Sequence, residues 1–230
     1  MAMQFGIDGD ERILVPQASQ LDMTSTISLC SWVNVQGTLP SPGLAWSEYM
    51  TKNDFYVLHY SAVEISSEFG FNSAGGWRLI HDGVFPTTGE WFHSCGTYDQ
   101  SASGNNFTIY RNGTLADSTR YTNAILTTAT GLSIASLNAS RYFPGLLEDC
   151  RIYNRALSAN EVATIYASQG QDSIYYGLVA KYSFDEGYNG QVASGTILDY
   201  SNYKNDGTAY GNPVWTDHYV ASHKGRYNMR

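Results

Sequence analysis

Four aromatic side chains beside polar loops are the first residues whose type suggests chemistry. Trp46, Tyr49, Tyr56 and Trp77 lie in or next to segments rich in Gly, Ser, Pro and Asn. An exposed aromatic ring stacks on the C–H face of a sugar, and neighbouring polar side chains bond the sugar hydroxyls. These four residues are therefore candidates for a glycan-binding site. The alternative is that each ring packs beneath a loop, which is the commoner role of a single Trp or Tyr.

Carboxylates in a pattern suited to glycoside cleavage are missing from the sequence. Such cleavage needs two carboxylates about 5 to 9.5 Å apart, which one strand would supply as E-x-D or D-x-x-x-E. Glu64 and Glu68 come nearest, and we interpret them as a solvated strand face. The chain also lacks G-x-S-x-G, H-E-x-x-H and G-x-x-x-x-G-K-[ST] motifs. We expect no catalytic residues and no enzyme activity.

A histidine and a cysteine offer one further candidate for nucleophilic chemistry. His93 and Cys95 alternate with Trp91, so all three share one face of a predicted strand. A thiolate beside an imidazole is an activated nucleophile. The aromatic neighbour favours a packed structural face instead. We predict the structural role.

The cysteines bear on the compartment in which the chain is made. Cys30, Cys95 and Cys150 are an odd number at wide spacing, each within an apolar strand-like run. This pattern predicts buried, reduced and unpaired thiols. The first sixteen residues also lack a charged start followed by an apolar run, so we expect no signal peptide and synthesis in a reducing cytoplasm.

Charge and hydropathy exclude two classes of partner. The formal net charge is −8, and the sequence has no Lys/Arg cluster that could release counterions from a phosphate backbone. Both observations argue against nucleic acid as a partner. No window approaches 18 consecutive apolar residues, so membrane insertion is not expected.

The segments that carry the candidate site residues are predicted to be short strands. Runs such as residues 27–33 and 107–111 alternate apolar and polar types between Gly, Asn and Asp clusters. Asn112-Gly113 predicts a tight hairpin, because both residues tolerate positive φ. Residues 158–168 predict the only good helix, since Ser158 and Glu161 form a capping box ahead of one apolar face. With 230 residues and 14% aromatics, the chain suits one large all-β domain.

Five segments together resemble a known family: residues 3–16, 27–35, 89–99, 107–118 and 143–166. They are similar to the laminin-G-like, pentraxin-like jelly roll of the concanavalin A-like lectin and glucanase superfamily. The last segment is the most specific, although Glu148 and Cys150 depart from the family pattern. The resemblance implies an all-β, antiparallel two-sheet jelly-roll sandwich with one short helix.

The order of the segments predicts a circular permutation within a single domain, residues 1–230. Residues 177–187, 198–202 and 205–215 resemble the family's opening strands, yet here they come last. We expect residues 1–170 to form the main body and residues 177–230 to complete the same sandwich. A strand over 179–184 should lie beside the closing strand over 146–153. A tandem array cut within a repeat, or a segment exchanged between subunits, is the alternative.

The resemblance also implies a structural calcium ion. In that superfamily a calcium often joins the closing strand to the opening one. Asp149, Asp185 and Asp199 are the corresponding candidate ligands, because hard cations take several carboxylate oxygens. The alternative is that Asp185 and Asp199 are ordinary turn-forming residues.

A fold of this kind hosts many functions, so three remain open. The first is a non-enzymatic lectin-like module that recognises a surface glycan. The second is a structural protein of a virus or phage, such as a capsid decoration, head-fibre or tail-associated protein displayed on the virion surface. The third is a glycoside-cleaving enzyme. The expected partner is a glycan or another protein surface, with a homo-oligomer or virion shell as the possible assembly.

Overall fold

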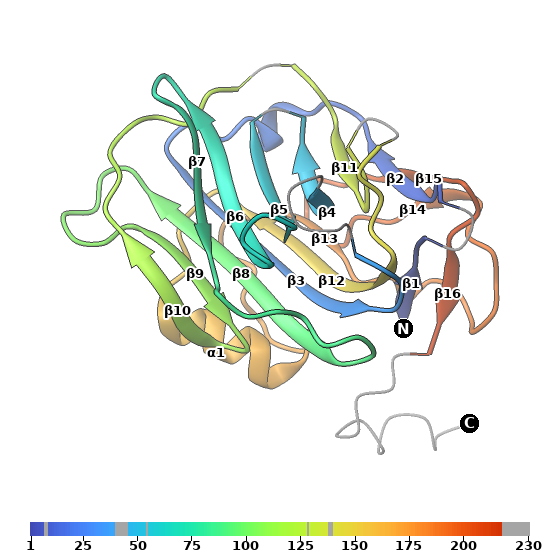
Figure 1. Ribbon diagram of the computed structural model, residues 1–230. Helices are drawn as coiled ribbons and strands as arrows, with labels where there is room; N and C mark the ends of the chain where they lie inside the picture. The colour runs from blue at the N-terminus through green and yellow to red at the C-terminus, as the bar shows by residue number, and fades with distance from the viewer. Residues whose placement is uncertain (7–8, 40–45, 54, 128, 138–139, 218–230) are drawn as a thin grey trace.

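Two antiparallel sheets form the body of the protein in a computed structural model, which describes residues 1–6, 9–39, 46–53, 55–127, 129–137 and 140–217 (Figure 1). Each sheet has eight strands. Sheet A has the order β10 (Thr114–Thr119), β9 (Phe107–Arg111), β8 (Trp91–Asp99), β3 (Thr26–Val35), β12 (Gly145–Tyr153), β1 (Ala2–Gln4) and β16 (Val214–Thr216), and β13 (Leu178–Tyr182) also pairs with β12.

Sheet B packs face to face with sheet A across the main apolar core. Its order is β14 (Gly195–Ile197), β15 (Gly207–Tyr210), β2 (Arg12–Val15), β11 (Leu132–Ile134), β4 (Trp46–Lys52), β5 (Tyr56–Ser61), β6 (Ser66–Ser73) and β7 (Gly76–His81). A short 3-10 turn, η1 (Ser19–Leu21), precedes β3. This arrangement confirms the predicted two-sheet jelly-roll sandwich.

Alternation along each strand decides which side chains enter the core. In β5, Tyr56, Leu58 and Tyr60 belong to the core cluster, whereas Val57 and His59 point to the outer face of sheet B. The outer face of sheet B therefore carries the side chains that are free to form a site.

Strands from both ends of the chain complete the sandwich. Strand β12 pairs with two strands from opposite ends of the chain: Leu147 lies opposite Met3 of β1, and Cys150 lies opposite Tyr182 of β13. The predicted strand beside the closing strand is thus confirmed. In sheet B, β15 pairs with β2, and in sheet A β16 pairs with β1. The circular permutation itself stays a prediction.

The local signals in the sequence correspond to local structure. Helix α1 (Ala159–Ser168) has Ser158 as its N-cap, and Glu161 completes the capping box from the third helical position. Asn112 and Gly113 connect β9 to β10 with φ values of 52° and 75°. At ten residues, α1 is short, and no helix within the described parts of the chain is long and apolar enough to cross a bilayer.

Helix α1 covers the outer face of sheet A. Beneath it lies a second apolar cluster that includes Val162 and Ile165 of the helix, Tyr110 and Tyr153 of the sheet, and the sulfurs of Cys30 and Cys95. Figure 1 shows the helix against β9 and β10, opposite to the side on which sheet B packs. The two outer faces of the sandwich are therefore covered unequally.

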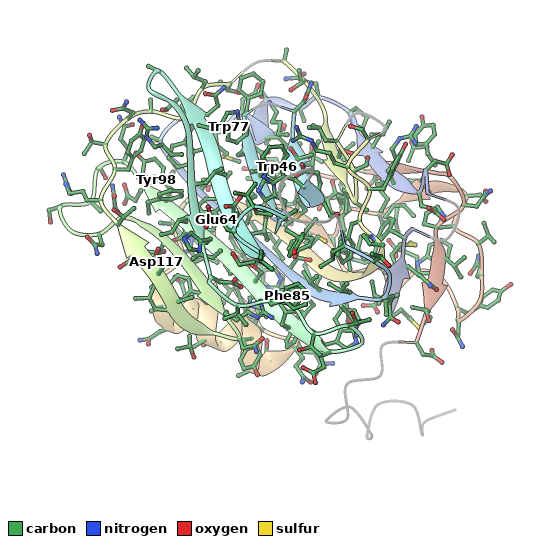
Figure 2. The ribbon with its side chains drawn as sticks, in the orientation of Figure 1. Trp46, Glu64, Trp77, Phe85, Tyr98 and Asp117 are labelled. Atoms are coloured by element: carbon green, nitrogen blue, oxygen red, sulfur yellow. A yellow bond between two sulfur atoms is a disulfide. The ribbon has the colours of Figure 1, made fainter. Side chains whose placement is uncertain are left out.

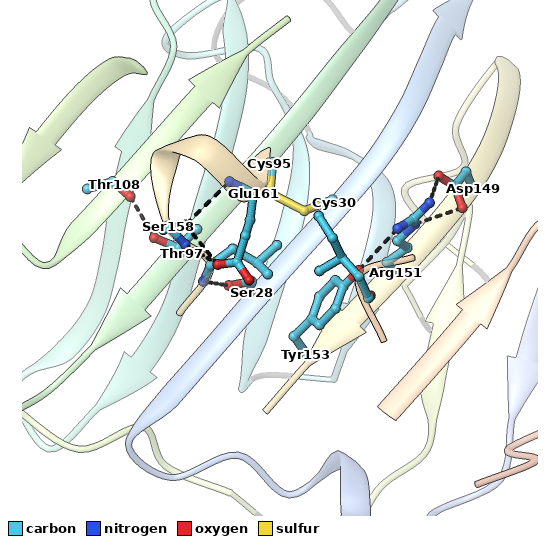
Figure 3. The surroundings of a disulfide bond; sticks show 12 residues. Ser28, Cys30, Cys95, Thr97, Thr108, Asp149, Arg151, Tyr153, Ser158 and Glu161 are labelled. Atoms are coloured by element: carbon cyan, nitrogen blue, oxygen red, sulfur yellow. Dashed lines mark hydrogen bonds and ion pairs between the residues drawn. A yellow bond between two sulfur atoms is a disulfide. The ribbon is translucent and has the colours of Figure 1, made fainter. Parts of the chain in front are cut away.

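The prediction of three reduced, unpaired cysteines is wrong. Cys30 of β3 and Cys95 of β8 lie directly opposite each other and form a disulfide, as Figure 3 shows. Cys150 alone is free, and burial raises the pKa of its thiol to about 12. Apolar neighbours indicated burial correctly, but the pairing depends on a strand register across 65 residues of chain. The expected cytoplasmic location rested in part on three reduced thiols. Disulfides persist in oxidising environments, so the cysteines no longer support that expectation.

Candidate functional site

A pocket of about 240 Å³ opens on the outer face of sheet B. Its walls come from β4, β5 and β7 and from the loop after β11, and its lining residues are Trp46, Glu48, Thr51, Val57, His59, Trp77, Leu79, Leu137 and Arg141. Figure 2 shows Trp46 and Trp77 over this half of the sheet. Two of the four aromatic residues predicted to bind a glycan therefore share one pocket.

Strand register explains why acidic and basic side chains meet here. Glu48 of β4 lies opposite His59 of β5, His59 lies opposite Glu68 of β6, and Glu68 lies opposite His81 of β7. We call these four residues the charged row. Opposite residues in antiparallel strands have their Cβ atoms only about 5 Å apart, so the row alternates carboxylate and imidazole side chains across four strands.

His59 is bonded on both sides by carboxylates. Its Nδ1 lies 3.2 Å from Oε2 of Glu48, and its Nε2 lies 2.9 Å from Oε2 of Glu68. All three side chains are at most 5% exposed. Burial lowers the pKa of His59, but the two carboxylates outweigh burial and raise the pKa to about 9. His59 is therefore an imidazolium at neutral pH.

Arg141 joins the charged row to the aromatic wall. Its guanidinium carbon lies 4.5 Å from the ring centroid of Trp46, and its Nη1 lies 3.5 Å from Oε1 of Glu48. The imidazole of His59 lies 6.2 Å from the same indole ring. Arg141 is 38% exposed, so the pocket presents hydrogen-bonding groups beside flat aromatic surface.

Tyr49 and Tyr56 do not reach the pocket, which corrects half of the predicted aromatic set. Both side chains are in the core, with 0% and 1% exposed. The hydroxyl of Tyr49 bonds Ser67, and that of Tyr56 donates to the carbonyl of Leu21. Tyr49 is three positions from Trp46 in β4, so alternation places the two rings on opposite faces of the sheet. The register shift between Glu48 and Met50 then brings Met50 into the core beside Tyr49.

Glu68 was expected on a solvated face, and the structure corrects this as well. Glu68 is 4% exposed and bonds His59, whereas Glu64 is 45% exposed in the turn between β5 and β6, with its Oε2 4.0 Å from His81. Glu48, His59 and Arg141 were missed by sequence reasoning. Their meeting depends on two paired strands, β4 and β5, and on a loop that lies about 80 residues further along the chain.

His93 and Cys95 form no nucleophilic pair. Cys95 is held in the disulfide, and His93 packs between Trp32 and Tyr166 with ring centroids 5.4 and 6.3 Å away. Neither ring nitrogen of His93 has a hydrogen-bond partner among the described residues. Burial lowers the pKa of His93 to about 4, so the ring is neutral at pH 7. The predicted structural role fits this packing.

Asp149 does not fit a calcium ligand. Its two carboxylate oxygens lie 2.8 and 2.7 Å from Nε and Nη2 of Arg151 (Figure 3). Nζ of Lys181 lies 3.4 Å from Oδ1 of Asp149. Arg151 also pairs with the buried carboxylate of Asp172 at 2.8 Å, so the cations Arg151 and Lys181 already balance two carboxylates here. A divalent cation in the same place would meet strong repulsion.

The other two predicted ligands, Asp199 and Asp185, each have a different bonding partner. Asp199 accepts backbone N–H bonds from Lys181, Ser201 and Asn205, which makes it a turn-forming residue. Asp185 is 57% exposed and pairs with the amino group of Met1. Within the described ranges, no group of three or more His, Cys, Asp or Glu side chains could hold a metal. We derive no role for calcium.

Solved structures with this fold include sugar-binding proteins and binding domains. A "putative carbohydrate binding protein" from Bacteroides ovatus has a TM-score of 0.70 and 19% identity, over 94% of this chain and 60% of its own. Domain 4 of an extracellular arabinanase from Geobacillus stearothermophilus, in complex with arabinotriose, has a TM-score of 0.56 and 17% identity, over 71% of this chain and 81% of its own. The chain thus spans less than two thirds of the first of these proteins.

A third similar structure is the binding domain of Paraclostridial Mosquitocidal Protein 1, with a TM-score of 0.53 and 15% identity, over 90% of this chain and 56% of its own. At these identities the likeness concerns the fold. No protein with a curated description matches the sequence.

The family of the chain is shown by a family model, because the solved structures are too distant in sequence to show it. It matches residues 8–163, which include most strands of both sheets and the start of α1. The chain belongs to the concanavalin A-like lectin/glucanases superfamily.

Proposed function

We propose that the chain is a non-enzymatic carbohydrate-binding domain, and that the pocket between Trp46 and Trp77 holds the sugar. The observation that carries the proposal is that partly exposed indole rings share one pocket with the polar groups of Glu48, His59 and Arg141. Indole rings stack on sugar C–H faces, and carboxylate and guanidinium groups bond hydroxyls in fixed directions. The arabinotriose in the fold relative supports a sugar as the ligand class.

The geometry of the charged row argues against glycoside cleavage. Glu48 and Glu68 do supply two carboxylates, which the sequence pattern did not predict. Both are bonded to the same imidazole, so His59 fills the space that a glycosidic oxygen or a water would need between them.

Binding can be tested with a glycan array followed by calorimetric titration of the sugars that bind. Trp46→Ala and Trp77→Ala should each weaken binding at least about tenfold, since each removes one stacking surface. Tyr188→Ala is the control, because Tyr188 is 70% exposed and lies outside the pocket lining. Binding that survives both tryptophan variants would refute the proposed site.

Two further assays separate the alternatives. Release of reducing ends from glucans, galactans or arabinans that disappears in Glu48→Gln or Glu68→Gln would make the domain an enzyme. A virion structural protein would instead be found in purified particles and show no sugar binding that depends on Trp46 or Trp77.

A further inference from the structure

We infer that the ligand is a linear, uncharged oligosaccharide that extends from the Trp46/Trp77 pocket across sheet B into a second pocket. This inference rests on the proposed function and adds the length and chemical class of the ligand. The second pocket has a volume of about 450 Å³ and lies over β2, β11 and β15. Leu137 lines both pockets, so they adjoin at this one side chain.

The floors of the two pockets lie along a single line of paired residues. In the second pocket, Thr208 of β15 is opposite Leu14 of β2, and Leu14 is opposite Ser133 of β11. Ser133 is in turn opposite Thr51 of β4, which belongs to the first pocket. The floor therefore passes from one pocket to the other without a change of register.

The same line continues beneath the tryptophans. Thr51 is opposite Val57, Val57 is opposite Gly70, and Gly70 is opposite Leu79 of β7. Gly70 leaves room for the side chain of Leu79, whose Cδ2 would lie 2.4 Å from any Cβ at this position. The central line thus consists mainly of small or short side chains and forms a shallow floor.

The length of this floor exceeds the size of one sugar. From β7 to β15 the line crosses seven neighbouring strands, and a strand spacing of 4.7–4.9 Å makes it about 28 Å long. A single terminal sugar would occupy only the first pocket. A chain of several sugars running perpendicular to the strands matches both pockets at once.

The chemistry of the second pocket indicates neutral sugars. Its lining residues are apolar or carry hydroxyl and amide groups, and no charged side chain belongs to the lining among the described residues. Tyr210 offers an aromatic face that is 44% exposed, with the guanidinium of Arg12 5.1 Å from its ring centroid. Tyr210 would therefore stack on the distal part of the chain as Trp46 and Trp77 do on the proximal part.

The inference is tested by titrating arabino-, xylo-, cello- and galacto-oligosaccharides of two to six sugars by calorimetry. In at least one series the six-sugar chain should bind about tenfold more tightly than the disaccharide, because it gains the second pocket. Tyr210→Ala should remove this gain and leave disaccharide affinity unchanged. Thr208→Arg, which places a long side chain in the second pocket, should do the same, and Tyr188→Ala should do neither.

Two kinds of failure can be told apart. Affinity that is equal for two and six sugars, or a length-dependent gain that persists in both Tyr210→Ala and Thr208→Arg, would overturn the extended site and leave the first pocket intact. No binding in any series, or binding insensitive to Trp46→Ala and Trp77→Ala, would overturn the proposed function and the extended site together. Circular dichroism and thermal melts of each variant check that the sandwich is still folded.

Discussion

The outer faces of the two sheets each bury one histidine, and the two histidines have opposite electrostatics. On sheet B, His59 lies between Glu48 and Glu68 at the base of an open pocket, and its pKa is about 9. On sheet A, His93 lies beneath α1 against Trp32 and Tyr166, and its pKa is about 4. Burial lowers the pKa of both histidines. Two carboxylates bonded to the ring outweigh burial at His59, whereas at His93 burial prevails because Arg151 opposes the more distant Asp149 and Asp172.

The same contrast separates a face built for packing from a face available to a ligand. Sheet A closes its outer face with a helix, a disulfide, an apolar cluster and the buried ion pairs of Arg151. Sheet B retains an open pocket in which Trp77 and the guanidinium of Arg141 remain within reach of solvent. A charged histidine needs polar partners, and those partners also suit sugar hydroxyls.

The largest expected effect comes from making the same substitution in both histidines. His59→Phe should lower the free energy of unfolding by about 3–5 kcal/mol, because two buried carboxylates lose the cation between them. His93→Phe should change the free energy of unfolding by less than about 1 kcal/mol, because it replaces unpaired ring nitrogens with apolar atoms of similar shape. Urea unfolding measures both. Equal losses would show that His59 is not the charged partner described.

The disulfide tests the covered face. The double variant Cys30→Ala/Cys95→Ala should lose about 2–4 kcal/mol of unfolding free energy, because the crosslink restricts the unfolded chain. Sugar binding at sheet B should be unchanged in that variant. Intact mass before and after reduction checks the bond, since reduction adds the mass of two hydrogens. An identical mass under both conditions would contradict the disulfide.

The pH dependence should show both histidines at once, each in its own range. The pKa of His59 is raised from 6.5 to about 9, so its stabilising contribution is complete below pH 6.5 and is lost as pH rises through 9. The pKa of His93 is lowered from 6.5 to about 4, so its contribution is complete above pH 6.5 and is lost as pH falls through 4. Each range should change the free energy of unfolding by about 3 kcal/mol.

Variants assign the two ranges. Urea unfolding from pH 4 to 10 measures both losses of stability. His59→Phe should still lose stability toward pH 4 through His93 but no longer toward pH 9, and His93→Phe should show the reverse. An alkaline loss that is undiminished in His59→Phe would mean that another group causes it.

The smallest effects on stability are expected for two aromatic residues, Tyr166 on the covered face and Trp77 on the open face. Tyr166→Ala removes the ring stacked on Trp32 at 5.4 Å and should cost about 1 kcal/mol of unfolding free energy. Trp77→Ala should cost less than about 0.5 kcal/mol, because Trp77 is 39% exposed, and yet it should weaken sugar binding. Thermal melts and titrations of both variants measure the two effects. Reversed results would mean that Trp77 packs and Tyr166 contacts the ligand.

Features that depend on neighbouring residues were predictable from the sequence. Ser158 and Glu161 cap α1, and Asn112-Gly113 forms the hairpin, because the partners lie within four residues of each other. The two-sheet sandwich followed from alternation and family resemblance, and the strand predicted beside β12 pairs there. Chain neighbours alone carry the cap and the hairpin, whereas the β12–β13 pairing was predicted from the family pattern.

Only the tertiary structure decided the residues that make the site and the crosslink. Glu48, His59 and Glu68 meet because three strands align in one register, and Cys30 meets Cys95 for the same reason. A shift of one residue would send each side chain to the other face of its sheet. Strand register depends on the whole sandwich, including segments from both chain ends, and no local pattern in the sequence encodes it.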